Sequence, residues 1–314
     1  MSRDDAELQI VQGMLSRERL AIDECDGKRT TFLTHVGATQ KLAAGAWIAH
    51  RDLIKALART RLSASQRHAL ARTVVADFER EFGVGRLRLE AVASGLPFGG
   101  ASLSMQARRG GIRCLYTWSL AREGARARAT DWLCLRAEAD WTLERQFRAL
   151  SVHGLGTLVG LGGNVALCVA DVLAARQVAE LVGDSIPLAA HPRFAPYLDR
   201  CDPKGSLLLW PHDAVLAPAL ERSRVSTMIL VSAPEEVRLQ SHRWAAGRPG
   251  VEVVEAGCPG RIDRPTLEKF WRACGAPKIL LRGDPEWASA GRAWLEGVGA
   301  TVVAHSRSTQ LTLL

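Results

Sequence analysis

The segment Thr34-His35-Val36-Gly37-Ala38-Thr39-Gln40 follows a short apolar run, at a place where a zinc-binding loop could stand. A His-x-His-x-Asp-His loop binds two zinc ions because its imidazoles and carboxylate converge on the ions at about 2 Å. Here His35 remains, while Gly37, Thr39 and Gln40 occupy the positions of the other three ligands. The loop therefore has the outline of a metal site without most of the side chains that bind metal.

No other spacing of histidines and serines supplies a catalytic motif. The sequence contains no His-Glu-x-x-His, His-x-His or Gly-x-Ser-x-Gly, so it gives no support to a zinc protease or an α/β-hydrolase. A set of Ser119, His35 and Asp263 that meets in space stays open as an unorthodox nucleophilic site. For His35 itself we favour a structural, hydrogen-bonded role over that of a metal ligand.

The elements that must position these residues alternate between strands and helices, which indicates an α/β sheet covered by helices. The predicted strands cover 32–35, 46–49, 87–92, 102–107, 112–117, 131–135, 156–164, 207–210, 228–231, 251–254, 278–281 and 301–304. The predicted helices cover the segment after Ala49 up to Leu57, then 65–82, 142–150, 165–182, 215–220, 265–274 and 286–296. Five apolar side chains of the last two helices are expected to pack on the sheet: Leu267, Phe270, Trp271, Trp294 and Leu295.

Four further segments, in order and spacing, carry a resemblance to a known family. Gly95-Leu96-Pro97-Phe98-Gly99-Gly100-Ala101-Ser102 is similar to Gly-His-x-x-Gly-Ser-Ala-Ser, and Cys114-Leu115-Tyr116-Thr117-Trp118-Ser119 to Leu-Tyr-Thr-Gly-Asp. Pro259-Gly260-Arg261-Ile262-Asp263 is similar to Ser-Gly-His-Ala-Asp, and Leu281-Arg282-Gly283-Asp284-Pro285-Glu286 to Val-His-Gly-Glu-Pro-Glu. With the loop at His35, they resemble the metallo-β-lactamase fold. The resemblance is specifically to its β-CASP branch, which includes ligase-associated DNA exonucleases and mRNA 3′-end processing nucleases.

The resemblance implies an α/β architecture, an αββα metallo-β-lactamase-like sandwich with a small inserted β-CASP-like cap. Residues 1–150 would form the first half of the sandwich, and residues 151–205 the cap. The segment 206–314 would return to complete the cap and the core.

Most of the metal-ligand positions that the resemblance implies hold other residues. These positions are His35, Gly37, Thr39, Gln40, Leu96, Ser119, Arg261 and Arg282. Guanidiniums are permanently charged and accept no bond from a metal, so Arg261 and Arg282 would repel a dication and suit an anion. We therefore expect no metal, no cofactor and no catalytic residue here. Either each arginine pairs with a carboxylate such as Asp263 or Asp284 and plugs the cavity, or the two bind a phosphate.

Arginines also gather at a predicted hairpin and after the strand that follows it. The formal net charge of +8 permits attraction to phosphate-rich partners. The candidate nucleic-acid contacts are Arg108, Arg109, Arg113, Arg122, Arg126 and Arg128, together with Arg261 and Arg282. A solvated basic edge explains the same pattern, so both interpretations stay open.

The composition predicts a cytoplasmic protein with reduced thiols. With 314 residues and 47% hydrophobic side chains, the chain can bury a substantial core. It has neither a long uncharged apolar stretch nor a signal-peptide pattern at its start. Its seven cysteines are scattered without a Cys-x-x-Cys pair, which favours buried, reduced thiols.

These features together predict a catalytically inactive metallo-β-lactamase/β-CASP pseudonuclease. It would act as a scaffolding or nucleic-acid-binding subunit for an active nuclease, helicase or ligase in nucleic-acid processing or DNA repair. Two alternatives stay open: a stand-alone nucleic-acid-binding protein that binds DNA or RNA, and a hydrolase with an unorthodox active site. No membrane partner is expected.

Overall fold

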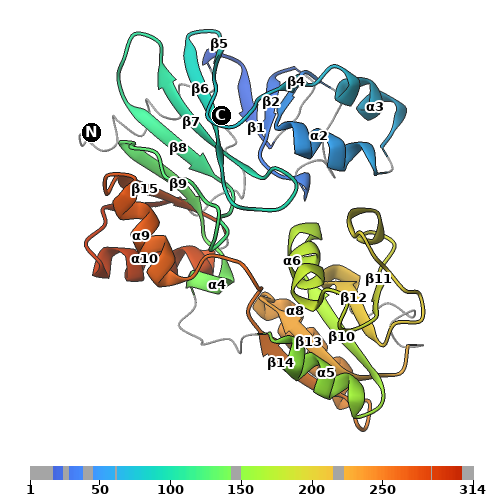
Figure 1. Cartoon of the computed structure of the whole chain (residues 1–314). Coiled ribbons are helices and arrows are strands. Elements are labelled where there is room, and N and C mark those ends of the chain that lie inside the picture. Colours follow the sequence, from blue (N-terminus) through green and yellow to red (C-terminus); the bar gives the residue numbers. More distant parts are fainter. Residues whose placement is uncertain are drawn as a thin grey trace. The chain divides into compact units, whose positions relative to one another are not determined.

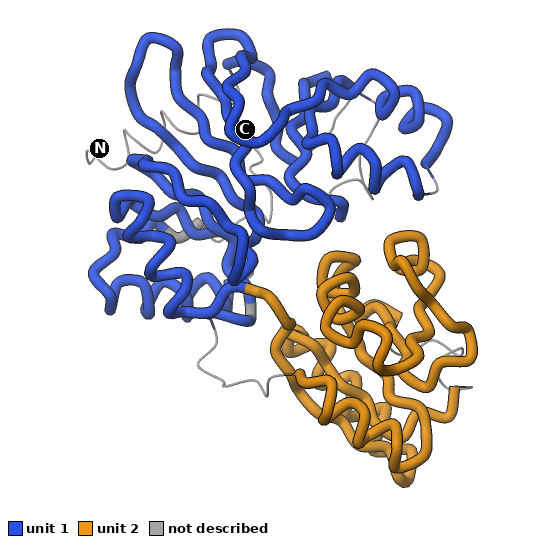
Figure 2. Tube along the Cα trace, viewed as in Figure 1, with its two compact units in different colours: residues 1–143, 262–314 blue, residues 144–261 orange. Residues whose placement is uncertain are grey.

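The chain is an α/β protein that divides into two compact units. The computed structural model describes residues 17–23, 28–37, 45–60, 62–142, 150–214, 223–283 and 285–305. Unit 1 comprises Met1–Leu143 and Ile262–Leu314, and unit 2 is the insertion Glu144–Arg261 (Figure 2). The sequence predicted a cap at 151–205 that part of 206–314 would complete, and the inserted unit runs from Glu144 to Arg261. Residues 206–261 therefore belong to the insertion, and only the part from Ile262 on returns to unit 1.

Unit 1 contains two sheets (Figure 1). The smaller sheet has four parallel strands in the order β1 (Leu20–Ile22), β2 (Thr30–Leu33), β3 (Trp47–Ala49) and β4 (Val74–Val75). The larger sheet has seven strands in the order β16 (Val302–His305), β15 (Lys278–Arg282), β9 (Trp132–Arg136), β8 (Arg113–Thr117), β7 (Ala101–Ala107), β6 (Leu87–Ala93) and β5 (Glu81–Val84). Strands β8, β9, β15 and β16 run parallel, and β5 to β8 are antiparallel neighbours.

Side chains of the larger sheet alternate between two cores, because successive strand residues point to opposite faces. Trp132 and Cys134 lie in a core shared with Ile22 and Phe32 of the smaller sheet, so the two sheets face each other. The other face carries Leu133 and Leu135, which pack with helices α9 (Arg264–Ala273) and α10 (Pro285–Gly297). As the sequence predicted, Leu267, Phe270, Trp271 and Leu295 are buried there, and Trp294 is partly buried. The remaining described helices of unit 1 are α2 (Arg51–Ala58), α3 (Ala64–Ala71) and α4 (Ala139–Thr142).

Unit 2 is built on one parallel sheet of five strands (Figure 1). The strand order is β11 (Leu188–Ala190), β12 (Leu207–Pro211), β10 (Asn164–Val169), β13 (Val225–Val231) and β14 (Glu252–Ala256). Its described α-helices are α5 (Val152–Gly160), α6 (Val172–Val182) and α8 (Glu235–Ala246). The central strand β10 is almost fully apolar and buried, as expected for a parallel strand covered on both faces.

The predicted helix 65–82 is wrong beyond its first two turns. The helix starts at Ala64 behind a capping box of Ser63 and Gln66 and ends at Ala71, and Val74–Val75 then pairs with β3 as a strand. The helical spacing of Leu70, Val74 and Phe78 suggested a longer helix. Two adjacent β-branched valines at the sheet edge favour the strand instead.

The order of strand and helix around the glycine turn was also predicted wrongly. Residues expected as a strand, 156–164, mostly belong to helix α5, while Val165 and its neighbours form the buried strand β10. The long predicted helix begins only at Val172, where Asp171 accepts a hydrogen bond from Ala174 N and caps it. Short apolar runs fit a buried strand and a buried helix equally well, and the cap at Asp171 was the signal that distinguished them.

Most other predicted elements occur within one or two residues of their expected bounds. Helix α8 was not predicted, because its mixed polar sequence has little helical periodicity. The predicted helix 215–220 and nearly all of 142–150 lie outside the described residues.

Candidate functional site

Two arginines lie side by side where strands β9 and β15 of the larger sheet end. Arg136 and Arg282 are the last residues of these parallel strands and are direct partners in the register. Each stands two residues after a side chain of the core between the sheets, Cys134 and Leu280, so both point toward the smaller sheet. Two positive charges are therefore held on one face of neighbouring strands.

One aromatic ring lies beside each of these guanidiniums. Cζ of Arg136 lies 4.4 Å from the ring centroid of Trp118, and the same ring stacks on the imidazole of His35 with the centroids 4.9 Å apart. Cζ of Arg282 lies 5.9 Å from the ring centroid of Tyr116. We call Arg136, Arg282, Trp118, Tyr116 and His35 the arginine cluster. Burial raises the pKa of the Tyr116 phenol and the negative charge of Asp23 adds to this, while the positive charge of Arg282 opposes it.

Neither arginine of the cluster has a carboxylate partner within the described ranges. The Arg282 side chain is buried, with 6% of the residue exposed, and its Nη2 has no hydrogen-bond partner there. The Nε of Arg136 is likewise buried and without a partner among those residues. An uncompensated buried charge destabilises a folded protein by about 3 to 5 kcal/mol. Such a pair of guanidiniums is suited to bind an anion.

Asp23 anchors the loop that carries His35. Its carboxylate accepts hydrogen bonds from Thr34 N at 2.8 Å and from Thr34 Oγ1 at 2.5 Å. His35 Nδ1 lies 2.9 Å from Thr34 Oγ1 and 3.7 Å from Asp23 Oδ2. All three residues are buried. His35 is therefore bound within a polar network, in agreement with the structural role that we favoured for it.

The positions that the resemblance assigns to metal ligands do not assemble a ligand set. A Cβ on Gly37 would lie 3.1 Å from His35 Cδ2, so the imidazole occupies the space that a side chain at Gly37 would need. Leu96 is buried, and Ser119 donates to Glu138 Oε2 at 2.9 Å. Thr39 and Gln40 lie outside the described residues. In the part of the chain that the structure describes, no three or more His, Cys, Asp or Glu side chains are grouped to hold a metal ion.

Arg261 and Arg282, which were expected to share one pocket, belong to different units. Arg261 Nη2 lies 3.5 Å from Asp171 Oδ2 within unit 2, so it pairs with a carboxylate other than the one expected. Asp263 instead caps α9 through Thr266 N and pairs with Arg122 at 2.5 Å. Asp284 lies outside the described residues. The ion-paired interpretation therefore suits Arg261, and the anion-binding interpretation suits Arg282.

The suggested nucleophilic set is dispersed among different partners. Ser119 bonds to Glu138, His35 to Thr34, and Asp263 to Thr266 and Arg122. Each of the three side chains is thus bonded to a different neighbour. We therefore draw no catalytic step from them.

The basic edge in unit 1 divides into paired and unpaired arginines. Arg113 pairs with Asp131, Arg122 with Asp263, and Arg128 with Glu90 and Glu79. The other three arginines, Arg108, Arg109 and Arg126, are exposed and have no carboxylate partner within the described ranges. These three can approach a phosphate backbone without breaking an ion pair.

Arg136 was missed by sequence reasoning, although a signal for it exists. Trp132, Cys134 and Arg136 alternate along one face of an apolar strand, and this strand lies beside β15 in a parallel sheet. Side chains at the carboxyl ends of neighbouring parallel strands meet at one edge of the sheet. The sequence shows that both predicted strands end in Arg. It does not show that the two strands are neighbours in the sheet.

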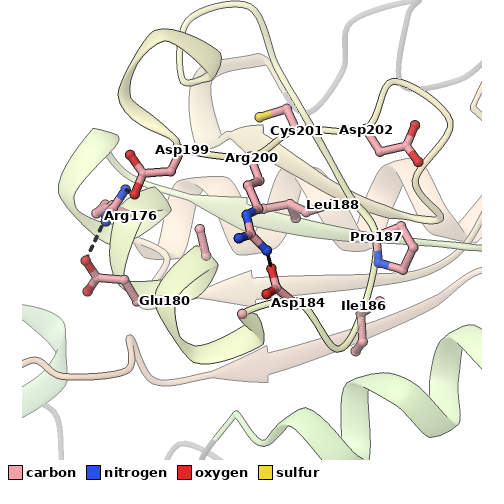
Figure 3. Close-up of a pocket in the computed structure, with 12 residues that line it drawn as sticks. Arg176, Glu180, Asp184, Ile186, Pro187, Leu188, Asp199, Arg200, Cys201 and Asp202 are labelled. Atoms are coloured by element: carbon pink, nitrogen blue, oxygen red, sulfur yellow. Dashed lines mark hydrogen bonds and ion pairs between the residues drawn. The ribbon is translucent and has the colours of Figure 1, made fainter.

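A cavity of about 760 Å³ in unit 2 is a second, differently charged candidate (Figure 3). Arg176 contacts Glu180 and Asp199, each at 2.7 Å, and Arg200 pairs with Asp184. Both guanidiniums of this cavity are thus neutralised by its own carboxylates, unlike those of the arginine cluster. Apolar side chains of Ile186, Pro187 and Leu188 complete the wall.

The described cysteines agree with reduced thiols for the most part. Cys114, Cys134, Cys168, Cys258 and Cys274 are free and buried, and Cys201 is free but exposed. The pKa of the Cys201 thiol is raised by desolvation, which lowers its reactivity at neutral pH. Within the described ranges, no helix combines the length and apolar character needed to cross a membrane.

Comparisons with known proteins define the fold and no more. No family model matches the chain, and no curated protein matches it. It is similar to the crystal structure of a protein of unknown function from Enterococcus faecalis V583, with a TM-score of 0.53 and 13% sequence identity. The similarity covers 90% of this chain and 80% of that one. At this identity, the two proteins share a fold, and no function follows from the likeness.

Proposed function

We propose that this protein is a metallo-β-lactamase/β-CASP-like pseudonuclease that binds nucleic acid without cutting it. It would serve as a binding or scaffolding subunit beside an active nuclease, helicase or ligase in nucleic-acid processing or DNA repair. The two facing sheets of unit 1, the helices α9 and α10 on the larger sheet and the inserted α/β unit support an αββα sandwich with a β-CASP-like cap.

One observation carries the proposal: a position that would hold a metal ligand holds Arg282, buried and without a carboxylate partner among the described residues. A guanidinium repels a metal ion and binds the oxygens of a phosphate. His35, the one histidine left of the expected set, is stacked on Trp118 and bonded to Thr34. The polar face that would activate water in a metal-dependent nuclease is thereby suited to hold a phosphate.

The three exposed arginines that have no carboxylate partner among the described residues are the second observation that supports nucleic-acid binding, and they provide its test. Changing Arg108, Arg109 and Arg126 together to alanine is expected to weaken binding of a fluorescent oligonucleotide, measured by anisotropy. For a single strand, the slope of log K against log salt should fall by about 2, because each lost phosphate contact contributes about 0.7.

A matched control removes the same charge from ion-paired arginines of unit 1. Arg88, Arg272 and Arg292 are exposed and pair with Glu81, Glu268 and Glu296, respectively. The triple alanine variant of this control set should bind nearly as well as the natural chain. Absence of oligonucleotide binding by the natural chain at low salt, or equal losses in the two triple variants, would contradict the proposed contact surface.

A further inference from the structure

Within the described residues, the two guanidiniums of the arginine cluster have no carboxylate partner, and one nitrogen of each is buried without an acceptor. Arg136 and Arg282 are register partners on adjacent parallel strands, whose backbones lie about 4.8 Å apart. Their guanidiniums carry two like charges on one face. The described neighbours are the ring of Trp118 beside Arg136, and Tyr116 and the Cys134 thiol beside Arg282. Two like charges on one face of neighbouring strands repel each other, and an anion close to both would offset this repulsion.

We propose that Arg136 and Arg282 form a binding site for one phosphoryl oxyanion. A tetrahedral anion accepts hydrogen bonds from both guanidiniums and compensates both charges at once. The buried Nη2 of Arg282 and the buried Nε of Arg136 are donors that still need an acceptor within the described part of the chain. The inference rests on the proposed function only for the source of the phosphoryl group, because free phosphate satisfies the same donors.

Access and orientation fit this assignment. Arg282 is buried, whereas Arg136 and Trp118 are partly exposed, so an anion reaches the cluster from their side. The stack of His35, Trp118 and Arg136 holds the Arg136 guanidinium against a rigid aromatic surface. Arg282 is fixed at the end of β15, where Ala137 N donates to Arg282 O at 2.6 Å. Both donors are thereby positioned by strands and not by mobile loops.

The test measures thermal unfolding of the full chain in sodium phosphate and in sodium chloride at equal pH and ionic strength. At a tenfold excess of phosphate over its half-saturating concentration, the midpoint should rise by about 3 °C or more. Phosphate also stabilises proteins without binding a site, so the variants decide. Arg136→Gln and Arg282→Gln should each remove the saturable part of the difference between the two salts and leave only the weak stabilisation that phosphate gives without a site. The control Arg272→Gln, at an exposed pair with Glu268, should retain it.

A further variant keeps the test decisive if Arg282→Gln fails to fold. Arg136→Met removes the charge while preserving an apolar contact with Trp118, so in phosphate-free buffer its midpoint should equal or exceed that of the natural chain. A large drop in that buffer would show that Arg136 is a structural residue and would overturn the proposal. An equal response to phosphate in both Gln variants and the natural chain would overturn it as well.

A competition experiment between phosphate and an oligonucleotide distinguishes a nucleic-acid phosphate from a free phosphate as the ligand. If phosphate displaces an oligonucleotide from the natural chain but not from Arg282→Gln, the site binds the nucleic-acid backbone. If phosphate binds without displacing the oligonucleotide, the site takes a free phosphate or another phosphorylated molecule. If the phosphate response persists but no oligonucleotide binds, the proposed function is wrong. If an oligonucleotide binds but phosphate has no effect beyond that on the Gln variants, the proposed phosphoryl site is wrong.

Discussion

Replacing Gly95 by alanine is expected to destabilise unit 1 by about 3 kcal/mol or more, measured as the free energy of unfolding in urea. Gly95 has φ +77°, and a Cβ there would lie 2.2 Å from Glu123 O and 2.8 Å from Ala125 N. Both atoms belong to backbone, which cannot move aside as a side chain can. The turn at Gly95 is therefore the place where the segment after β8 packs closely onto the β6–β7 connection.

Gly110→Ala is the matched control for Gly95→Ala. Gly110 also has positive φ, +86°, but a Cβ there would meet nothing within 4 Å. This substitution should cost only about 1 kcal/mol, the strain of a left-handed alanine. Equal losses in the two variants would show that backbone strain alone, and not the close approach at Gly95, determines the effect.

Replacing Asp23 by alanine is expected to destabilise the protein by about 2 to 4 kcal/mol, because two buried donors of Thr34 lose the carboxylate that accepts from them. The Thr34 N–H would lose its acceptor, and the hydroxyl of Thr34 would lose the partner that orients it toward His35. Chemical denaturation measures the loss. It should accompany a change in the fluorescence of Trp118, which stacks on His35.

Glu296→Ala is the comparison for Asp23→Ala. Glu296 is 45% exposed and pairs with Arg292 one helical turn away, so its loss should cost no more than about 0.5 kcal/mol. If Asp23→Ala proves equally mild, the loop at His35 is held by other contacts, and the network described above is not what fixes it.

Strands and capped helices could be predicted well from the sequence wherever a single periodicity dominated. The strands that end in Thr117, Arg136 and Arg282 were placed nearly correctly, because their apolar runs are bounded by turns and polar residues. The prediction was wrong for apolar runs without periodicity. At Val165, for example, the local sequence fits a buried strand and a buried helix equally well.

The candidate site could be predicted only in part. Arg282 was found through a motif. Arg136 is a candidate anion-binding residue only because it lies beside Arg282 on the neighbouring parallel strand. The expected grouping of Arg261 with Arg282 followed from the motifs, but Arg261 pairs with Asp171 in unit 2. Ion pairs between residues far apart in sequence decide which arginines remain able to bind an anion, and sequence spacing does not reveal them.

The most direct test of the proposed function is the binding and fate of a labelled oligonucleotide mixed with the purified full chain, with and without EDTA. We predict the same affinity in both conditions and a strand of unchanged length, since no described side chains are grouped to hold a metal that would activate water. Loss of binding in EDTA would contradict the proposal. So would cleavage that disappears when His35 is changed to alanine.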